Sequence, residues 1–236
     1  MRMPFFIAKI IAKIVGKFAV EPIKTKTMQL ITGSQLKAIT TTLNQERCDE
    51  LAELLNEKAA EYGVKSFDEF AEFLANITQE SGEYRYKTED MSYSAKRIVS
   101  LFPKRFPTLA SALPYQHKPK EFANKLYGGR YGNRPGTDDG WNLRGGGFIG
   151  LTFYDTWKKY ADYKKMSVEQ ASEYARNSDE GAMDSAFWFF YVLKDLRRQA
   201  IDDNFIGIVK SINGGTIGLS HRQQYYDRIK KVLGSV

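Results

Sequence analysis

Two glutamates nine residues apart, Glu80 and Glu89, are the side chains of this 236-residue chain best suited to acid/base chemistry. Glu80 closes a helix-like run that begins at Phe67, and Glu89 lies in the irregular polar segment that follows. Partial burial at the margin of an apolar helix face and the negative end of the helix dipole both favour the protonated form of Glu80, as a general acid requires. Glu89, in a polar loop near Lys87, is expected to stay ionised and to act as a base. The alternative for Glu80 is an ordinary surface glutamate in a last helical turn.

The helix that carries Glu80 has a clear start signal and one apolar face. Ser66 is a favourable N-cap residue, and Glu69 three positions later completes the pattern of a capping box. Apolar residues then recur at helical spacing, which predicts a buried face. That face consists of Phe67, Phe70, Ala71, Leu74, Ile77 and Thr78. Residues 83–90, in contrast, are polar and rich in tyrosine, so we expect them to lie outside the core.

Helical patterns dominate the rest of the chain, and no run of alternating apolar and polar residues predicts a sheet. The fold is therefore expected to be mainly α. Four of the seven prolines fall within residues 103–120, which favours a surface loop there. Trp188 lies in a strongly apolar helical segment and is interpreted as core. The expected helices cover residues 34–39, 44–62, 94–102, 121–127, 152–163, 167–176, 184–200, 205–212 and 219–233.

A glycine-rich stretch precedes Thr152. Gly145, Gly147 and Gly150 formally match the G-x-G-x-x-G pattern of dinucleotide sites. No β-branched strand precedes these glycines and no Lys-Ser/Thr pair follows them, so we reject both a dinucleotide site and a phosphate loop. We expect a tight loop or cleft wall instead, where the backbone closely approaches a ligand.

Composition excludes several classes of function. The content of 42% hydrophobic and 27% charged residues is that of an ordinary globular protein. A single cysteine, Cys48, excludes an internal disulfide framework, and two histidines with one cysteine cannot supply a His/Cys metal site. Of the net charge of +7, residues 1–27 contribute +5, so the remaining chain is close to neutral and does not suggest nucleic-acid binding. No metal and no cofactor are expected.

Residues 5–20 form four near-repeats and predict a cationic amphipathic helix. Lys9, Lys13 and Lys17 share one narrow stripe, and apolar side chains cover the other sides. Such a helix can lie in a membrane interface, although it is too short and too often charged to span a bilayer comfortably. A terminal helix that docks on the main domain and an export or anchor signal are the alternatives.

Four motifs in order, Gln79-Glu80-Ser81-Gly, Glu89, the stretch from Trp141 to Thr152, and Ile212-Asn-Gly-Gly, resemble glycoside hydrolase family 19. The resemblance is closest to its bacteriophage endolysin and bacterial lysozyme-like branch, and covers about residues 34–233. It implies a lysozyme-like, two-lobed helical domain with a central substrate cleft. Residues 1–27 then form a separate cationic helix and linker, and residues 28–236 the catalytic domain.

The resemblance also implies the roles of individual residues. Glu80 corresponds to the general acid, Glu89 to the base that activates water, and Thr152 to a hydroxyl that positions this water. The family inverts configuration, which predicts carboxyl groups roughly 6.5–9.5 Å apart or wider. Seven further residues correspond to positions that bind substrate or support the cleft: Gln79, Tyr127, Arg130, Asn133, Trp141, Asn213 and Arg222.

Three departures from the family pattern lie near the expected scissile bond. Gln79 replaces a histidine, Gly146 replaces an arginine, and Gly150 replaces a glutamine. The acid, the base and the hydroxyl are all retained, so activity is still expected. The two glycine replacements remove polar contacts and leave the rate and the substrate preference open.

The expected function is that of a monomeric, muramidase-type endolysin that cleaves the β-1,4 glycan strands of peptidoglycan. The resemblance implies synthesis in the cytoplasm of a host bacterium and action on its cell wall, in the periplasm of a Gram-negative host. Residues 5–20 would engage an anionic membrane or lipopolysaccharide. Two alternatives remain open: a chitinase, and a catalytically weakened protein that binds glycans or disrupts membranes.

Overall fold

The computed structural model describes residues 28–234, and this part of the chain is helical, with only isolated β-bridges that join Thr88 to Gly146 and Gly146 to Leu151. The predicted mainly α fold is therefore confirmed. Within these residues no helix is both long and apolar enough to cross a membrane. The helices are α2 (Gly33–Ile39), α3 (Gln45–Glu61), α4 (Phe67–Glu80), α5 (Ala95–Leu101), α6 (Leu109–Ala112), η2 (Leu113–Tyr115), α7 (Pro119–Tyr127), α8 (Asp139–Asn142), α9 (Tyr154–Lys164), α10 (Val168–Asn177), α11 (Asp179–Trp188), η3 (Phe189–Leu193), α12 (Arg197–Ile201), α13 (Phe205–Asn213) and α14 (Leu219–Leu233).

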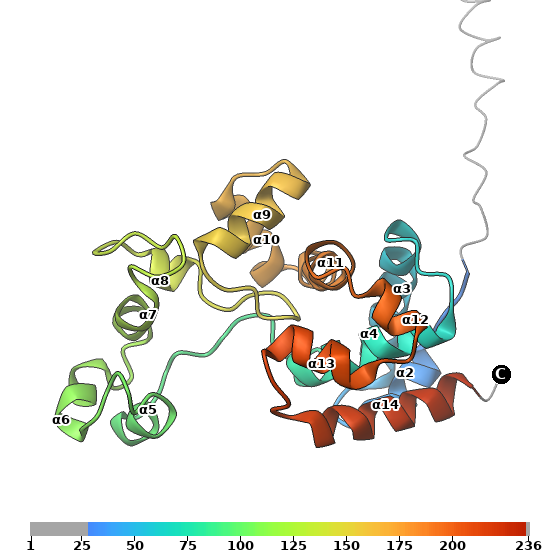
Figure 1. The fold of residues 1–236 in the computed structure, drawn as a ribbon, viewed down its shortest axis with the longest axis horizontal. Coiled ribbons are helices and arrows are strands. Elements are labelled where there is room, and N and C mark those ends of the chain that lie inside the picture. Colours follow the sequence, from blue (N-terminus) through green and yellow to red (C-terminus); the bar gives the residue numbers. More distant parts are fainter. Residues whose placement is uncertain (1–27, 235–236) are drawn as a thin grey trace, which may run out of the picture.

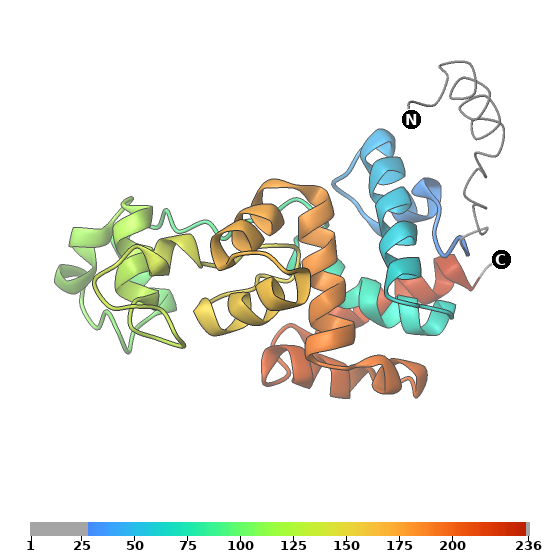
Figure 2. The same cartoon turned by 90° about the horizontal axis from the view of Figure 1, so that it is seen from above.

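Two separate hydrophobic cores produce the predicted two lobes. The large lobe is built on α2–α4 and α9–α14, and its core extends from Leu30 to Leu233. The small lobe contains α5–α8 around a core that includes Ile98, Phe106 and Phe122. Figure 1 shows α5–α8 at one end of the molecule and α2, α3 and α14 at the other, with α9 and α10 between them. Seen from above in Figure 2, α11 stands between the two groups of helices.

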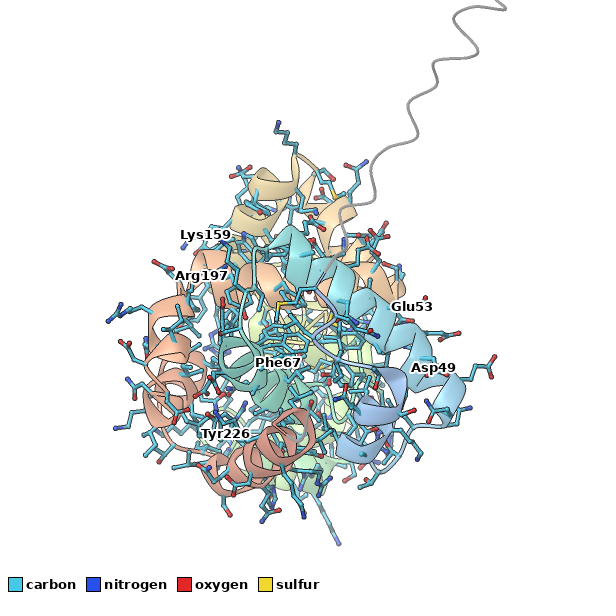
Figure 3. All side chains as sticks on the ribbon, turned by 90° about the vertical axis from the view of Figure 1, so that its right-hand side faces the viewer. Asp49, Glu53, Phe67, Lys159, Arg197 and Tyr226 are labelled. Atoms are coloured by element: carbon cyan, nitrogen blue, oxygen red, sulfur yellow. The ribbon has the colours of Figure 1, made fainter. Side chains whose placement is uncertain are left out.

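Helix α4 is enclosed on nearly all sides, with α14 packed along it. Figure 3, viewed onto this end of the large lobe, shows α4 surrounded by α3, α14 and the helices of residues 197–213. The Ser66 hydroxyl caps α4 by accepting from the Glu69 N–H, as predicted. The predicted capping box is not completed, because the Glu69 carboxylate does not accept from the Ser66 N–H. It accepts from the Lys65 N–H and pairs with Arg197 instead. Phe67 is also more exposed than predicted, at 36%.

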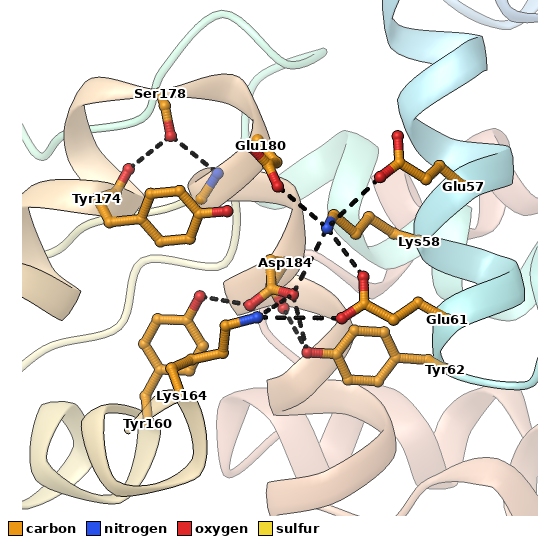
Figure 4. Close-up of polar contacts among 11 residues, drawn as sticks. Glu57, Lys58, Glu61, Tyr62, Tyr160, Lys164, Tyr174, Ser178, Glu180 and Asp184 are labelled. Atoms are coloured by element: carbon orange, nitrogen blue, oxygen red, sulfur yellow. Dashed lines mark hydrogen bonds and ion pairs between the residues drawn. The ribbon is translucent and has the colours of Figure 1, made fainter. Parts of the chain in front are cut away.

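A buried polar cluster around Asp184 joins three helices of the large lobe (Figure 4). The Asp184 carboxylate accepts from the hydroxyls of Tyr62 at 3.1 Å and Tyr160 at 2.6 Å, and from Lys164 at 3.0 Å. These partners come from the end of α3 and from α9, so the buried charge is compensated where the helices meet. One turn later Trp188 is 2% exposed, which confirms that it belongs to the core.

Three predictions about local structure are wrong. Residues 184–200 are not one helix. Helix α11 passes into the π-helical turn η3, and the chain then breaks at Asp195, whose φ of 48° is incompatible with a right-handed helix. Residues 103–120 are not all loop, since a reciprocal capping box between Thr108 and Ser111 starts α6. Tyr84 was expected outside the core and is buried, with its ring against Phe148.

Candidate active site

Two adjoining pockets, of about 310 and 190 Å³, form a groove at the C-terminal end of α4. Glu80 and Thr152 line both pockets. Glu89 and Tyr127 line the larger one, and Asn213 lines the smaller one. The structure therefore brings the predicted acid, base and hydroxyl into one groove, together with the amide of the Asn-Gly-Gly turn.

Glu80 is the last residue of α4, and its side chain is held by an arginine from the other end of the chain. Arg222, on α14, is 4% exposed and makes an ion pair with the Glu80 carboxylate. The same guanidinium donates to the Asn76 side-chain oxygen at 3.1 Å and to that of Asn213 at 3.3 Å. Arg222 therefore connects the Glu80 carboxylate to the Asn213 side chain, both of which line the groove.

Glu89 is held by neutral donors. The Tyr127 hydroxyl donates to one carboxylate oxygen at 2.7 Å, and the Gly145 N–H donates to the other at 3.1 Å. Burial and the neighbouring carboxylate raise the pKa of Tyr127 well above its usual value, so its hydroxyl remains a proton donor at neutral pH. The expectation that Lys87 supports Glu89 is wrong, because Lys87 pairs with Asp179 at 2.9 Å.

The glycine-rich stretch forms one wall of the groove, as predicted from the sequence. Gly145, Gly147 and Gly150 line it. A Cβ at Gly145 would lie 3.1 Å from a carboxylate oxygen of Glu89, so a larger residue would disturb the base. Gly147 and Gly150 both have φ near 70°, a conformation that favours glycine.

The space beside Gly146, where the family pattern has an arginine, is filled in this chain. A Cβ at Gly146 would lie 2.7 Å from the Arg176 side chain and 3.0 Å from the Trp157 ring. The Arg176 guanidinium donates to the Asn142 carbonyl, and burial lowers the pKa of Arg176 to about 10. The sequence contains no signal that this distant arginine packs here.

Thr152 and Asn213 come from distant parts of the chain and both present polar groups to the smaller pocket. The Thr152 hydroxyl donates to the Gly150 carbonyl at 2.9 Å, which leaves its oxygen able to accept. Asn213 ends α13, where Gly214 adopts the left-handed conformation that terminates the helix. Its amide donates to the Ile217 carbonyl at a long 3.3 Å.

Three predicted cleft residues in the small-lobe half lie outside the two pockets and support them. Asn133 is 3% exposed, donates to the Tyr127 carbonyl at 3.1 Å and accepts from the Tyr154 N–H at 2.9 Å. Arg130 lies over the Phe153 ring at 5.3 Å. Trp141 is covered by the Arg144 guanidinium, 3.5 Å from its ring centre.

Gln79 is separated from the groove although it precedes Glu80 in the sequence. It lines a different pocket of about 300 Å³, which His221, Tyr225 and Glu83 also border. Successive residues of a helix point about 100° apart, so Gln79 and Glu80 face different surfaces. Sequence reasoning missed Tyr86, which is 60% exposed and lines the groove. Its signal was an aromatic in an otherwise polar segment.

The chemistry available in the groove is acid/base chemistry between two carboxyl groups. Among residues 28–234, no group of three or more histidine, cysteine, aspartate or glutamate side chains could hold a metal ion. The two carboxylates are supported in different ways, by a guanidinium at Glu80 and by a hydroxyl and an amide at Glu89. Such a pair can divide the roles of proton donor and proton acceptor.

Comparison with known proteins identifies the family. No family model matches the chain. The chain is 30% identical over 158 residues to a glycosyl hydrolase family 19 domain-containing protein of Haemophilus influenzae, across 66% of this chain and 76% of that protein. Its fold is similar to that of chitinase C from Streptomyces griseus, with a TM-score of 0.60 at 14% identity, covering 87% of this chain and 93% of the other. A mutant of chitinase C gives 0.58 at 15% identity, covering 88% and 78%. The chain belongs to glycosyl hydrolase family 19.

Proposed function

We propose that this glycoside hydrolase is a muramidase-type endolysin that hydrolyses the β-1,4 bonds of peptidoglycan with inversion. The observation that carries the proposal is the groove in which Glu80, Glu89, Thr152 and Asn213 converge from four segments of the chain. Two carboxyl groups in such a groove meet the requirement of glycoside cleavage for one proton donor and one base.

In the proposed mechanism, Glu80 donates its proton to the departing glycosidic oxygen and becomes a carboxylate. Arg222 already contacts this carboxyl group, so its guanidinium stabilises the negative charge as it develops. Glu80 itself is exposed, but Arg222 is buried and already in contact with it, so the guanidinium needs no rearrangement during the reaction.

Glu89 then accepts a proton from the attacking water on the opposite side of the sugar. The hydroxyl of Tyr127 and the amide of Gly145 fix the orientation of the Glu89 carboxylate. The Thr152 hydroxyl and the Asn213 amide are polar groups of the groove wall that can hold the water and the adjacent sugar. Water attack opposite the leaving group gives the inverted product.

A chitinase is the second candidate, favoured by the two chitinase structures whose fold this chain shares. The two functions differ in the polymer cleaved and in the sugar left at the reducing end. Incubation of the protein with purified peptidoglycan and with chitin oligomers, followed by mass spectrometry of the products, separates them. We expect muropeptide products with muramic acid at the reducing end. An N-acetylglucosamine reducing end would indicate a glucosaminidase, and turnover of chitin alone would indicate a chitinase.

The envelope role of residues 5–20 rests on their sequence pattern, since they lie outside the described residues. We propose that they bring the enzyme to an anionic membrane or lipopolysaccharide, and that the enzyme acts on the cell wall after synthesis in a bacterial cytoplasm. A chain that begins at Met28 should digest isolated walls at the full rate but lyse intact cells more slowly. Equal lysis by both chains would contradict this role.

A further inference from the structure

A second cavity, of about 440 Å³, lies in the small lobe next to the catalytic groove. It is formed by the end of α5 and the following turn, residues 101–105, and by the end of α7 and the following turn, residues 126–130. Tyr127 lines both this cavity and the groove, where its hydroxyl donates to Glu89. Tyr127 is therefore shared between the cavity and the groove and contacts the proposed base.

The cavity is rich in positive charge that is not neutralised. Lys104, Arg105 and Arg130 line it, and no acidic residue does. None of these three cations has a carboxylate within 4.0 Å among residues 28–234. Arg105 and Arg130 each donate to a backbone carbonyl at 3.4 Å, which restrains the guanidinium without compensating its charge. Such an arrangement suits a ligand that carries carboxylates.

The floor of the cavity is apolar. Leu101 is 41% exposed, and it lies beside Phe102, Pro103 and Leu126. An exposed leucine on a basic rim suits a ligand with both small apolar groups and carboxylates. A sugar chain without charged branches offers no carboxylate to these cations, whereas the peptides attached to alternate sugars of peptidoglycan offer both kinds of group.

We propose that this cavity binds the acidic peptide attached to the sugar that lies beside Glu89. This inference rests on the proposed function, because it assigns the peptide branch of the same substrate to a second site. The cavity would then distinguish peptidoglycan from chitin, since only the first polymer carries a ligand that satisfies Lys104, Arg105 and Arg130.

The test removes two cations that contact neither carboxylate of the groove. The full-length K104Q/R105Q variant is compared with wild type on peptidoglycan with intact peptides and on the same glycan after an amidase has removed them. We expect the variant to lose roughly five- to twentyfold in kcat/KM on intact peptidoglycan, mainly through KM, because two charge-assisted contacts are lost. On the stripped glycan it should stay within about twofold of wild type.

A matched control separates a specific site from general attraction to an anionic wall. Lys96 and Arg97 form a second adjacent pair of cations on α5, are exposed, and lie outside the cavity. The K96Q/R97Q variant removes the same charge and should leave both rates unchanged. Equal losses in the two double variants, or equal losses of K104Q/R105Q on both polymers, would overturn the proposal. Thermal melting verifies that both variants are folded.

A binding measurement keeps this inference separate from the proposed function. Co-sedimentation with insoluble intact peptidoglycan, in competition with soluble stripped glycan, compares the two affinities without turnover, so it remains informative even if the protein cleaves neither. We expect wild type to bind intact peptidoglycan more tightly than stripped glycan, and K104Q/R105Q to lose that difference. If the protein hydrolyses neither polymer but still prefers intact peptidoglycan, the endolysin function is refuted and the peptide site is supported. Equal binding of wild type to both polymers would refute the site.

Discussion

The two carboxylates of the groove are supported by different parts of the molecule and by different chemistry. Glu80 is paired with Arg222, which lies 142 positions later in the sequence and is buried against α4. Glu89 is held by Tyr127 and Gly145, which lie 38 and 56 positions away and carry no charge. Glu80, the proposed acid, is thus fixed within the large lobe, and Glu89, the proposed base, is fixed where the small lobe meets the glycine-rich wall.

We propose roles that agree with this difference. A guanidinium stabilises the carboxylate that a general acid becomes once it has given up its proton. Neutral hydrogen-bond donors orient a base without neutralising the charge with which it attracts a proton from water. Substitutions at each carboxylate and at each supporting group should therefore give distinguishable kinetic signatures.

The largest effect is expected for Glu80→Gln, which removes the proton donor but keeps the size of the side chain. Turnover of a natural glycan should fall by about 10³-fold or more. A nitrophenyl glycoside leaves without protonation, so on such a substrate the loss should shrink to about tenfold. Steady-state rates on the two substrates measure this difference.

Glu89→Gln is the matched variant for that comparison. Water must be activated whatever the leaving group, so its loss should be similar on both substrates, at about 10²- to 10³-fold. If Glu80→Gln lost as much activity on the nitrophenyl glycoside as on the glycan, Glu80 would not be the acid. The reverse pattern would exchange the two roles.

Arg222→Lys should reduce kcat on the glycan by about 10- to 100-fold while KM changes little, because lysine cannot reproduce the guanidinium fork that holds Glu80 and Asn76. Since Arg222 acts through Glu80, this loss should also shrink on the nitrophenyl glycoside. A loss that is equal on both substrates would indicate a purely structural role. Thermal melting separates any loss of stability, which is expected because Arg222 is buried.

Tyr127→Phe removes a single hydroxyl from Glu89 and keeps the ring that packs against Phe153. A loss of about tenfold is expected, the same on both substrates, because the hydroxyl supports the base. Tyr131→Phe is the control, since Tyr131 packs on the same phenylalanine but is 62% exposed. A Tyr127→Phe variant as active as wild type would show that Gly145 alone positions the base.

The sequence predicted the elements more reliably than the contacts between them. The start of α4 follows from the Ser66 cap and its apolar spacing, and the four motifs placed Glu80, Glu89, Thr152 and Asn213 in one groove. The partner of Glu80 was not predictable, because no local pattern connects residues 142 positions apart. Lys87 was expected near Glu89 because the two are close in sequence, but its ion-pair partner is Asp179, which lies 92 positions later. The break at Asp195 was missed because its neighbours are strong helix formers.

The smallest expected effect on turnover comes from a third carboxyl group, that of Glu72, whose substitution should instead change how stability depends on pH. Glu72 lies two turns before Glu80 on α4, is 0% exposed, and neither of its oxygens makes a hydrogen bond of good geometry. Burial, with a smaller contribution from the Asp203 carboxylate, raises the pKa of Glu72 to about 8, and the adjacent Tyr226 hydroxyl partly offsets this. At neutral pH the folded protein therefore holds a proton on Glu72.

The sign of the effect on stability follows from this raised pKa. The unfolded chain releases the Glu72 proton near pH 4.5 and the folded chain near pH 8, so the free energy of unfolding falls as pH rises between these values, by on the order of 5 kcal/mol. Glu72→Gln should abolish that slope, raise the melting temperature at pH 8.5 relative to wild type, and leave turnover at pH 6 within about twofold. Glu53→Gln, on the exposed side of α3, should change neither. If the melting temperatures of Glu72→Gln and wild type change in parallel from pH 5 to 9, Glu72 does not hold a proton in the folded protein at neutral pH.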